Sequence, residues 1–249
     1  MQYLRRMERT EISELGEFGL IRRMTQNLNH QQPSTLRGVG DDAAVIDPLG
    51  KRVVVTTDML CEGVHFDLSY APLKHLGYKA VVVNLSDVCA MNATPTQVVV
   101  GLGLSNRFSV EAVDELYAGI RLACEVYKVD LIGGDTTSSP SGLTLSVTAM
   151  GLADADALVG RDGAGDGDLL VASGDLGAAY MGLQILEREK TVFQAAPTAQ
   201  PELADFAYLL ERQLKPEARV DVVREMGDLG LKPTAMIDIS DGLSSEVMH

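Results

Sequence analysis

The sequence predicts an α+β fold built from two domains, the second of which is an α/β domain that lacks part of its C-terminal structure. Three observations lead to this prediction. Helical apolar patterns alternate with short strand-like runs over residues 1–152. A segment rich in Gly, Asp and Ala at 153–167 is typical of a linker. Strand and helix signals then resume over 168–249, and 249 residues suffice for two domains.

The first predicted elements are one helix and two strands. Residues 10–28 carry apolar side chains at helical spacing, which predicts a helix. Residues 29–37 are polar and include a proline, so we expect a loop there. The apolar runs at 43–47 and 52–58 are expected to form a β-hairpin across the Pro-Leu-Gly turn at 48–50.

The rest of the first domain is predicted to alternate helices with strands. Apolar periodicity predicts helices over 72–91 and 109–128, and Ser109 is suited to cap the second of them. Strands are expected at 97–104, 129–135 and 143–152.

The second domain is expected to begin with a strand at 169–172, followed by a Ser-Gly-Asp-Leu-Gly turn. The remaining elements predicted for it are helices at 178–188, 201–214 and 217–226, a strand at 235–239 and a helix from Gly242. Since the chain ends one or two turns into that last helix, we expect the rest of the domain to be absent or supplied by another chain.

Composition excludes several classes of function. A formal net charge of −14 and a pI near 4.6 oppose binding to a nucleic-acid backbone. No apolar run approaches the roughly 20 residues of a membrane span. The basic residues near the N-terminus are not followed by the apolar core of a secretory signal, so we expect a cytoplasmic protein.

Soft-metal chemistry is also disfavoured. Cys61, Cys89 and Cys124 are too far apart for a structural zinc site, and their surroundings predict small buried side chains. The four histidines show no ligand spacing.

Four segments place acidic residues at the ends of short apolar runs or beside glycines. They are GVGDD at 38–42, VVVTTD at 53–58, VDLIGGDTT at 129–137 and AMIDISDG at 235–242. A single acid at a strand end commonly forms a turn or caps a helix. Four such segments together favour one shared site with oxygen ligands, which is the chemistry of a hard cation.

Collecting these acids in one place would bring like charges together, which bound Mg²⁺ would neutralise while bridging to substrate phosphates. The acids concerned are Asp41, Asp42, Asp58, Asp87, Asp135, Asp238 and Asp241. Neither a Walker motif nor a Rossmann fingerprint is present, because the glycines at 163–167 follow no strand signal. The absence of a nucleophile elbow favours direct phosphoryl transfer stabilised by metals.

Six stretches resemble the thiamine-monophosphate kinase family, within the aminoimidazole ribonucleotide synthetase-like superfamily of ATP-using enzymes. They are GEFGLI at 16–21, GVGDDAAV at 38–45, TTDMLCEGVHF at 56–66, KAVVVNLSDVCAMNATP at 79–95, LIGGDTT at 131–137 and IDISDG at 237–242. The resemblance implies ATP-dependent phosphorylation of thiamine monophosphate to thiamine diphosphate, with several Mg²⁺ ions and no phosphoenzyme. It also implies a homodimer and a mixed-sheet N-terminal domain over 1–152 that binds metal and ATP.

The same resemblance implies roles for individual residues. The metal ligands would be Asp42, Thr56, Thr57, Asp58, Asp87, Asp135, Asp238 and Asp241. The ATP contacts would be Tyr117, Gly134, Asp135, Arg161 and Ser240, and the substrate contact would be His65.

Plainer interpretations stay open for Asp41 as a turn former, Arg161 as a solvated charge, Thr56 as a strand residue and His65 as a packing residue. Two other functions stay open as well: another enzyme of the superfamily, or a truncated nucleotide-binding module without activity.

Overall fold

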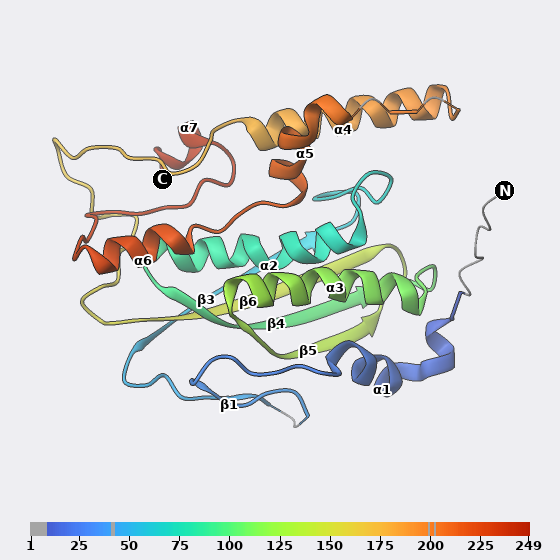
Figure 1. Ribbon diagram of the computed structural model, residues 1–249, viewed down its shortest axis with the longest axis horizontal. Helices are drawn as coiled ribbons and strands as arrows, with labels where there is room; N and C mark the ends of the chain where they lie inside the picture. The colour runs from blue at the N-terminus through green and yellow to red at the C-terminus, as the bar shows by residue number, and fades with distance from the viewer. Residues whose placement is uncertain (1–8, 41–42, 199, 202) are drawn as a thin grey trace.

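The computed structural model describes residues 9–40, 43–198, 200–201 and 203–249. It contains a four-stranded sheet with two long helices over one face and the remaining C-terminal helices beyond them (Figure 1). The two covering helices are α2, Leu73–Ala90, and α3, Val110–Tyr127. Helix α2 contacts both the sheet and the C-terminal helices, so it joins the two parts of the chain.

The sheet is mixed, which confirms the predicted fold class. Its strands are β3, Arg52–Cys61; β4, Thr94–Leu104; β5, Asp130–Ser138; and β6, Leu143–Ala153. The order across the sheet is β3-β6-β4-β5, with β6 antiparallel to both neighbours and β5 parallel to β4. Strands β3, β4 and β5 therefore run in one direction, and their carboxyl ends lie at the same edge.

Alternation of side chains along the strands gives the sheet one buried face and one open face. Val98, Val100 and Leu102 of β4 are buried in the core that the sheet forms with α2 and α3. On the open face, Val53 and Val55 of β3 are exposed. This core is the structural base on which the candidate site is built.

Helices α2 and α3 pack unusually closely where two glycines face the opposite backbone. A Cβ atom on Gly77 would lie 2.0 Å from the Leu116 carbonyl oxygen, and one on Gly119 would lie 1.8 Å from that of Lys74. Ser109 caps α3 with its side chain, as predicted. The two helices therefore form a rigid layer over the sheet.

The N-terminal region confirms one predicted element and corrects another. Helix α1, Ile12–Thr25, lies within the predicted range and contacts α3. The hairpin prediction was wrong: β2, Val45–Ile46, pairs with β1, Thr35–Arg37, whereas β3 pairs with β6. Strands β2 and β3 are close in sequence, but β3 pairs with β6, whose residues lie about a hundred positions further along the chain.

The predicted C-terminal helices all form. They are α4, Ala178–Ala195; the 3₁₀ turn η1, Ala204–Phe206, with α5, Ala207–Leu214; α6, Val220–Asp228; and α7, Leu243–Glu246.

The strands predicted at 169–172 and 235–239 were wrong. Leu169, Leu170 and Val171 are 89%, 73% and 84% exposed, and neither segment pairs with another strand. Apolar runs become strands only when a neighbouring strand accepts their backbone hydrogen bonds. The domain limits at 153–167 remain a prediction. In the described part of the chain, no helix is long and apolar enough to cross a membrane.

Candidate active site

Three of the predicted acids meet where β3, α2 and the segment after α6 come together. They are Asp58 on β3, Asp87 on α2 and Asp238. Burial raises the pKa of each carboxyl, and the charge of a neighbour in this group raises it further. Asp87 and Asp238 lie within hydrogen-bond reach of each other. We call these three residues the carboxylate cluster.

Strand β3 and helix α2 position two members of the cluster. Thr56 donates its hydroxyl hydrogen to Asp87 Oδ2 at 2.7 Å. Asn84, only 1% exposed, accepts the Asp58 backbone N–H at 2.9 Å through Oδ1 and donates to the Ala80 carbonyl through Nδ2. Asn84 and Asp87 are three residues apart on α2, so both reach the same strand.

Lys79, on the same helix, serves a different contact. Its ammonium donates to the Gln213 carbonyl oxygen at 3.0 Å, beside the C-terminal end of α5. Burial lowers the pKa of Lys79. This cation therefore joins α2 to α5 and does not neutralise the carboxylate cluster.

The third member, Asp238, is brought in by a backbone contact with the loop near residue 160. Met236 N donates to the Gly160 carbonyl at 3.1 Å, and a Cβ on Gly163 would lie 2.0 Å from the Thr234 carbonyl oxygen. Glycine is required at 163 because the two backbones approach so closely. A Ser86 hydrogen bond partly offsets the effect of burial on the pKa of Asp238.

Two predicted basic contacts lie beside the cluster. Arg161, which is exposed, is near enough for its charge to lower the pKa of Asp87 against the effect of burial. His65 is exposed as well; its Nδ1 accepts the Cys61 N–H at 3.0 Å, and its charge lowers the pKa of Asp58, again against burial. Both residues therefore lie where an anionic ligand of the cluster would be contacted.

Ser240 and Asp241 follow Asp238 in an exposed turn. Their backbone N–H groups donate to Glu246 Oε1 at 3.2 and 3.0 Å. The sequence had not indicated Glu246. An acid four residues after the Gly242 turn was the available signal, because such an acid sits in the first turn of the following helix.

Register places Thr57 and Asp135 away from the cluster. Asp58 aligns with Val147, Val100 and Gly134 across the sheet, whereas Asp135 aligns with Gly101, Ser146 and Met59. Neighbouring positions on a strand face opposite sides, so Asp135 and Thr57 lie on the open face.

Asp135 is also three strand spacings from β3, roughly 14 Å. A single chain therefore does not bring Asp135 to Asp58. Glycine is needed at position 134 for packing, because a Cβ there would lie 2.2 Å from the Val100 carbonyl oxygen.

One predicted ATP contact is buried in the core. Tyr117 is 4% exposed in the core of α3, where burial raises its pKa to about 12, so its side chain has no surface to offer a nucleotide. Asp41 and Asp42 lie outside the described residues, so their assignments stay predictions.

The donors present fit a hard cation, although no metal cage is preformed. The cluster and Thr56 offer only carboxylate and hydroxyl oxygens, which suit Mg²⁺. Burial, followed by the negative charge of another cluster member, raises their pKa values, and a bound cation would offset both effects. Among the described residues, no three His, Cys, Asp or Glu side chains are gathered closely enough to hold a metal by themselves.

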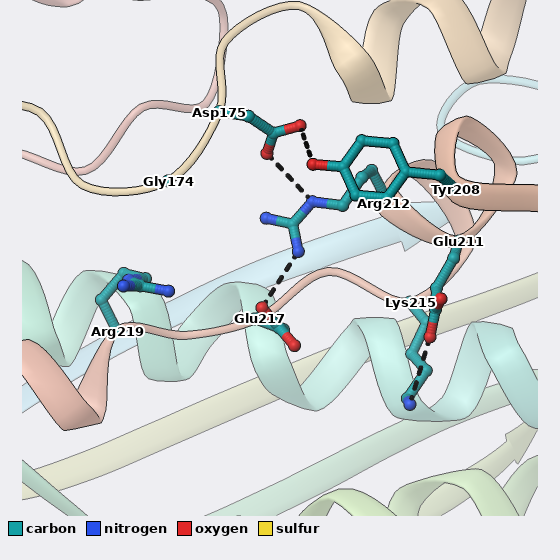
Figure 2. Close-up of a pocket in the computed structure, with 8 residues that line it drawn as sticks. All are labelled: Gly174, Asp175, Tyr208, Glu211, Arg212, Lys215, Glu217 and Arg219. Atoms are coloured by element: carbon teal, nitrogen blue, oxygen red, sulfur yellow. Dashed lines mark hydrogen bonds and ion pairs between the residues drawn. The ribbon is translucent and has the colours of Figure 1, made fainter.

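A separate polar pocket of about 400 Å³ lies between the 174–175 turn and α5 (Figure 2). Asp175 accepts from the Tyr208 hydroxyl at 2.6 Å and from Arg212 Nε at 3.1 Å, and Arg212 also pairs with Glu217 at 3.0 Å. Acids and bases balance in this pocket. Most of these charges pair with one another, so the pocket has the character of a structural ion-pair network.

Comparison with known proteins defines the class and then the family. The family model of the AIR synthase related protein, N-terminal domain, matches residues 40–153, which hold the sheet and two members of the cluster. The fold of this part of the chain is thus of the AIR synthase related class.

More specific relatives cover nearly all of the chain. Thiamine-monophosphate kinase of Aquifex aeolicus is 37% identical over 96% of this chain and 71% of its own length, and that of Bacillus subtilis is 32% identical over 94% and 69%. A solved structure described as AaThiL complexed with AMPPCP and TMP aligns with a TM-score of 0.70 and 36% identity, covering 94% of this chain and 69% of that one. The chain belongs to the thiamine-monophosphate kinase family.

Proposed function

We propose that the chain transfers the γ-phosphoryl group of ATP to thiamine monophosphate, giving thiamine diphosphate and ADP in the cytoplasm. The observation that carries this proposal is the meeting of Asp58, Asp87 and Asp238, which come from three separate family motifs, in one carboxylate cluster. A relative solved with AMPPCP and TMP supports both ligands. The 1–152 unit would bind metal and ATP, and the 168–249 unit would close over the phosphates.

The chain's own residues provide the electrostatic setting for this reaction. Bound Mg²⁺, held by the cluster and Thr56, would supply neutralisation of the phosphate charge. Thr56 holds one oxygen of Asp87, while Asn84 fixes the backbone of Asp58. Arg161 adds a positive charge beside the cluster.

The transfer itself needs no covalent enzyme intermediate. A phosphate oxygen of thiamine monophosphate attacks the γ-phosphorus, the bond from that phosphorus to the β-bridging oxygen breaks, and ADP leaves with the electron pair. The proposal assigns contact with the acceptor to His65, and its electrostatic effect on Asp58 supports this assignment.

The proposal includes a homodimer formed through the open face of the sheet. Val53, Val55 and Met59 expose apolar side chains there, and Asp135 lies on the same face. Pairing two such faces would bury the apolar residues and give Asp135 a neighbouring chain. Light scattering after size exclusion should give twice the chain mass, and a clean monomer would refute this part.

The test of the activity is ADP and thiamine diphosphate formation from ATP and Mg²⁺, with and without thiamine monophosphate. Asp87→Asn should lower turnover about a hundredfold or more, because it removes a carboxylate that would hold the Mg²⁺ needed to neutralise the transferring phosphate. Glu115→Gln, which changes an exposed acid on α3, is the matched control and should leave turnover unchanged. Nucleotide binding without ADP release would favour a non-catalytic module, and ADP release only with another acceptor would favour a sister enzyme.

A further inference from the structure

Glu246 is a buried acid that the proposed reaction does not use. It lies in the short helix α7, is 8% exposed, and ranks among the few buried charged residues of the described chain. Its Oε1 accepts two consecutive backbone N–H groups, those of Ser240 and Asp241. Its Oε2 is buried and has no hydrogen-bond partner among the described residues.

The local backbone ties Glu246 firmly to this turn. Gly242 has φ +118°, a conformation that favours glycine, and it lets the chain reverse after Asp241. The N–H groups of Ser245 and Glu246 then donate to the Gly242 carbonyl at 2.9 and 3.2 Å. The acid and the turn therefore form one closed ring of hydrogen bonds.

We infer that Glu246 is a positioning residue that fixes the turn at 240–241. By fixing this turn, it holds Asp238 in the carboxylate cluster and holds the position of Ser240. This inference rests on the proposed function. Hydrogen bonds from two amides to one carboxylate are charge-assisted and stronger than neutral ones. No other described side chain accepts from these two amides.

A rival role makes the opposite prediction. Two consecutive backbone N–H groups can also form a concave anion site that would hold a nucleotide phosphate. If that were their purpose, Glu246 would compete with the phosphate, and its removal would strengthen nucleotide binding. The sign of the change in affinity therefore separates the two roles.

The experiment is calorimetric titration of the chain with AMPPCP and Mg²⁺, using Glu246→Ala, Glu246→Gln and the control Ser244→Ala. We expect the alanine variant to bind about tenfold more weakly or worse, since two charge-assisted bonds are lost. Glutamine keeps an accepting oxygen, so it should stay within about threefold of the parent chain. Ser244 is exposed on the same helix and should have no effect. Unchanged or tighter binding by Glu246→Ala overturns the inference.

Hydrogen exchange separates failure of this inference from failure of the proposed function. In the nucleotide-free chain, the amides of residues 240 and 241 should exchange faster in Glu246→Ala and stay protected in Glu246→Gln. If the parent chain binds no nucleotide, the kinase proposal fails, but the exchange result still decides the positioning role. Unchanged protection in Glu246→Ala, with the same far-UV circular dichroism as the parent, refutes it.

Discussion

The chain joins a sheet region, residues 45–153, to a helical region, residues 154–249. The two regions differ in how much apolar surface they bury. Nearly all of the buried apolar side chains belong to the sheet region, which includes α2 and α3. The helical region buries only a few, such as Ile185, Leu186 and Val223, and leaves many apolar residues exposed.

Many contacts between the two regions are polar. Lys190 pairs with Asp67 at 2.7 Å, and Tyr70 donates to Glu187 at 2.7 Å. The backbone N–H of Ala218 donates to the Tyr127 hydroxyl at 3.0 Å. Polar contacts of this kind each stabilise a structure modestly. The apolar part of the contact is small, with Ala218 and Val223 as the buried residues of the helical region that join the main core.

This difference matters for the site. Asp58 and Asp87 are carried by the sheet region, whereas Asp238 is carried by the helical region. The carboxylate cluster therefore exists only while the helical region is docked. Where a second part is joined to a core largely by polar contacts, ligand binding can stabilise the joined state and so complete the site.

The largest stability effect is expected inside the sheet region. Gly119→Ala places a Cβ 1.8 Å from the Lys74 carbonyl oxygen and must separate α2 from α3, which should cost about 3 kcal/mol in the free energy of unfolding. Urea unfolding followed by circular dichroism measures this cost.

Gly227→Ala in α6 is the matched control. Nothing lies within 4 Å of the added atom, and alanine favours a helix, so stability should stay the same or rise by up to about 1 kcal/mol. Equal losses in both variants would contradict the contrast between the two regions.

A smaller effect is expected at the docking contact. Tyr127→Phe removes the hydroxyl that accepts the buried Ala218 N–H. This should cost about 1 kcal/mol in the free energy of unfolding, and the effect should fall mainly on the segment that connects α5 to α6. Hydrogen exchange should speed up at residue 218 while β4 and β6 stay protected. Tyr180→Phe, at an exposed position, serves as the control. Equal acceleration throughout the sheet would show that the two regions unfold as one unit.

The smallest effect is expected from the ion pair between the regions. Hydrogen bonds from Lys190 and Ser69 lower the pKa of Asp67 to about 2. Because this folded pKa lies below the ordinary value of 3.8, the Asp67 carboxylate stabilises the fold above about pH 4 and loses that contribution as the pH falls toward 2.

Asp67→Asn should therefore lower stability at pH 7 by less than about 1 kcal/mol, since the pair is partly exposed. Thermal melts of the two proteins should converge between pH 4 and pH 2. A difference that persists unchanged at pH 2 would rule out the ion pair as its source.

The sequence predicted those elements whose signals are local. The periodicity of α2 and α3 and the Ser109 cap are present within each helix, and both were confirmed. Strand partners are not local: Arg52 pairs with Ala153, and nothing in 43–58 distinguishes that pairing from a hairpin. The apolar run at 169–172 satisfied the strand pattern but has no partner strand.

The site shows the same limit. Motifs identified Asp58, Asp87 and Asp238, and the fold brings these together. Which face a strand residue occupies depends on register, so the separation of Asp135 from Asp58 could not be predicted. For Glu246 the sequence offers only the weak signal of an acid in the first turn after Gly242, because its partners are backbone amides, which the sequence does not identify.

The most direct test of the central claim, that acids from both regions form one site, is a double-mutant cycle on Mg²⁺-dependent AMPPCP binding with Asp58→Asn, Asp238→Asn and the double variant. Each single change should weaken binding about tenfold or more, and the double change should be within about threefold of the weaker single variant, because residues of one site are coupled. Losses that multiply fully, or binding that either single variant leaves intact, would contradict a shared site.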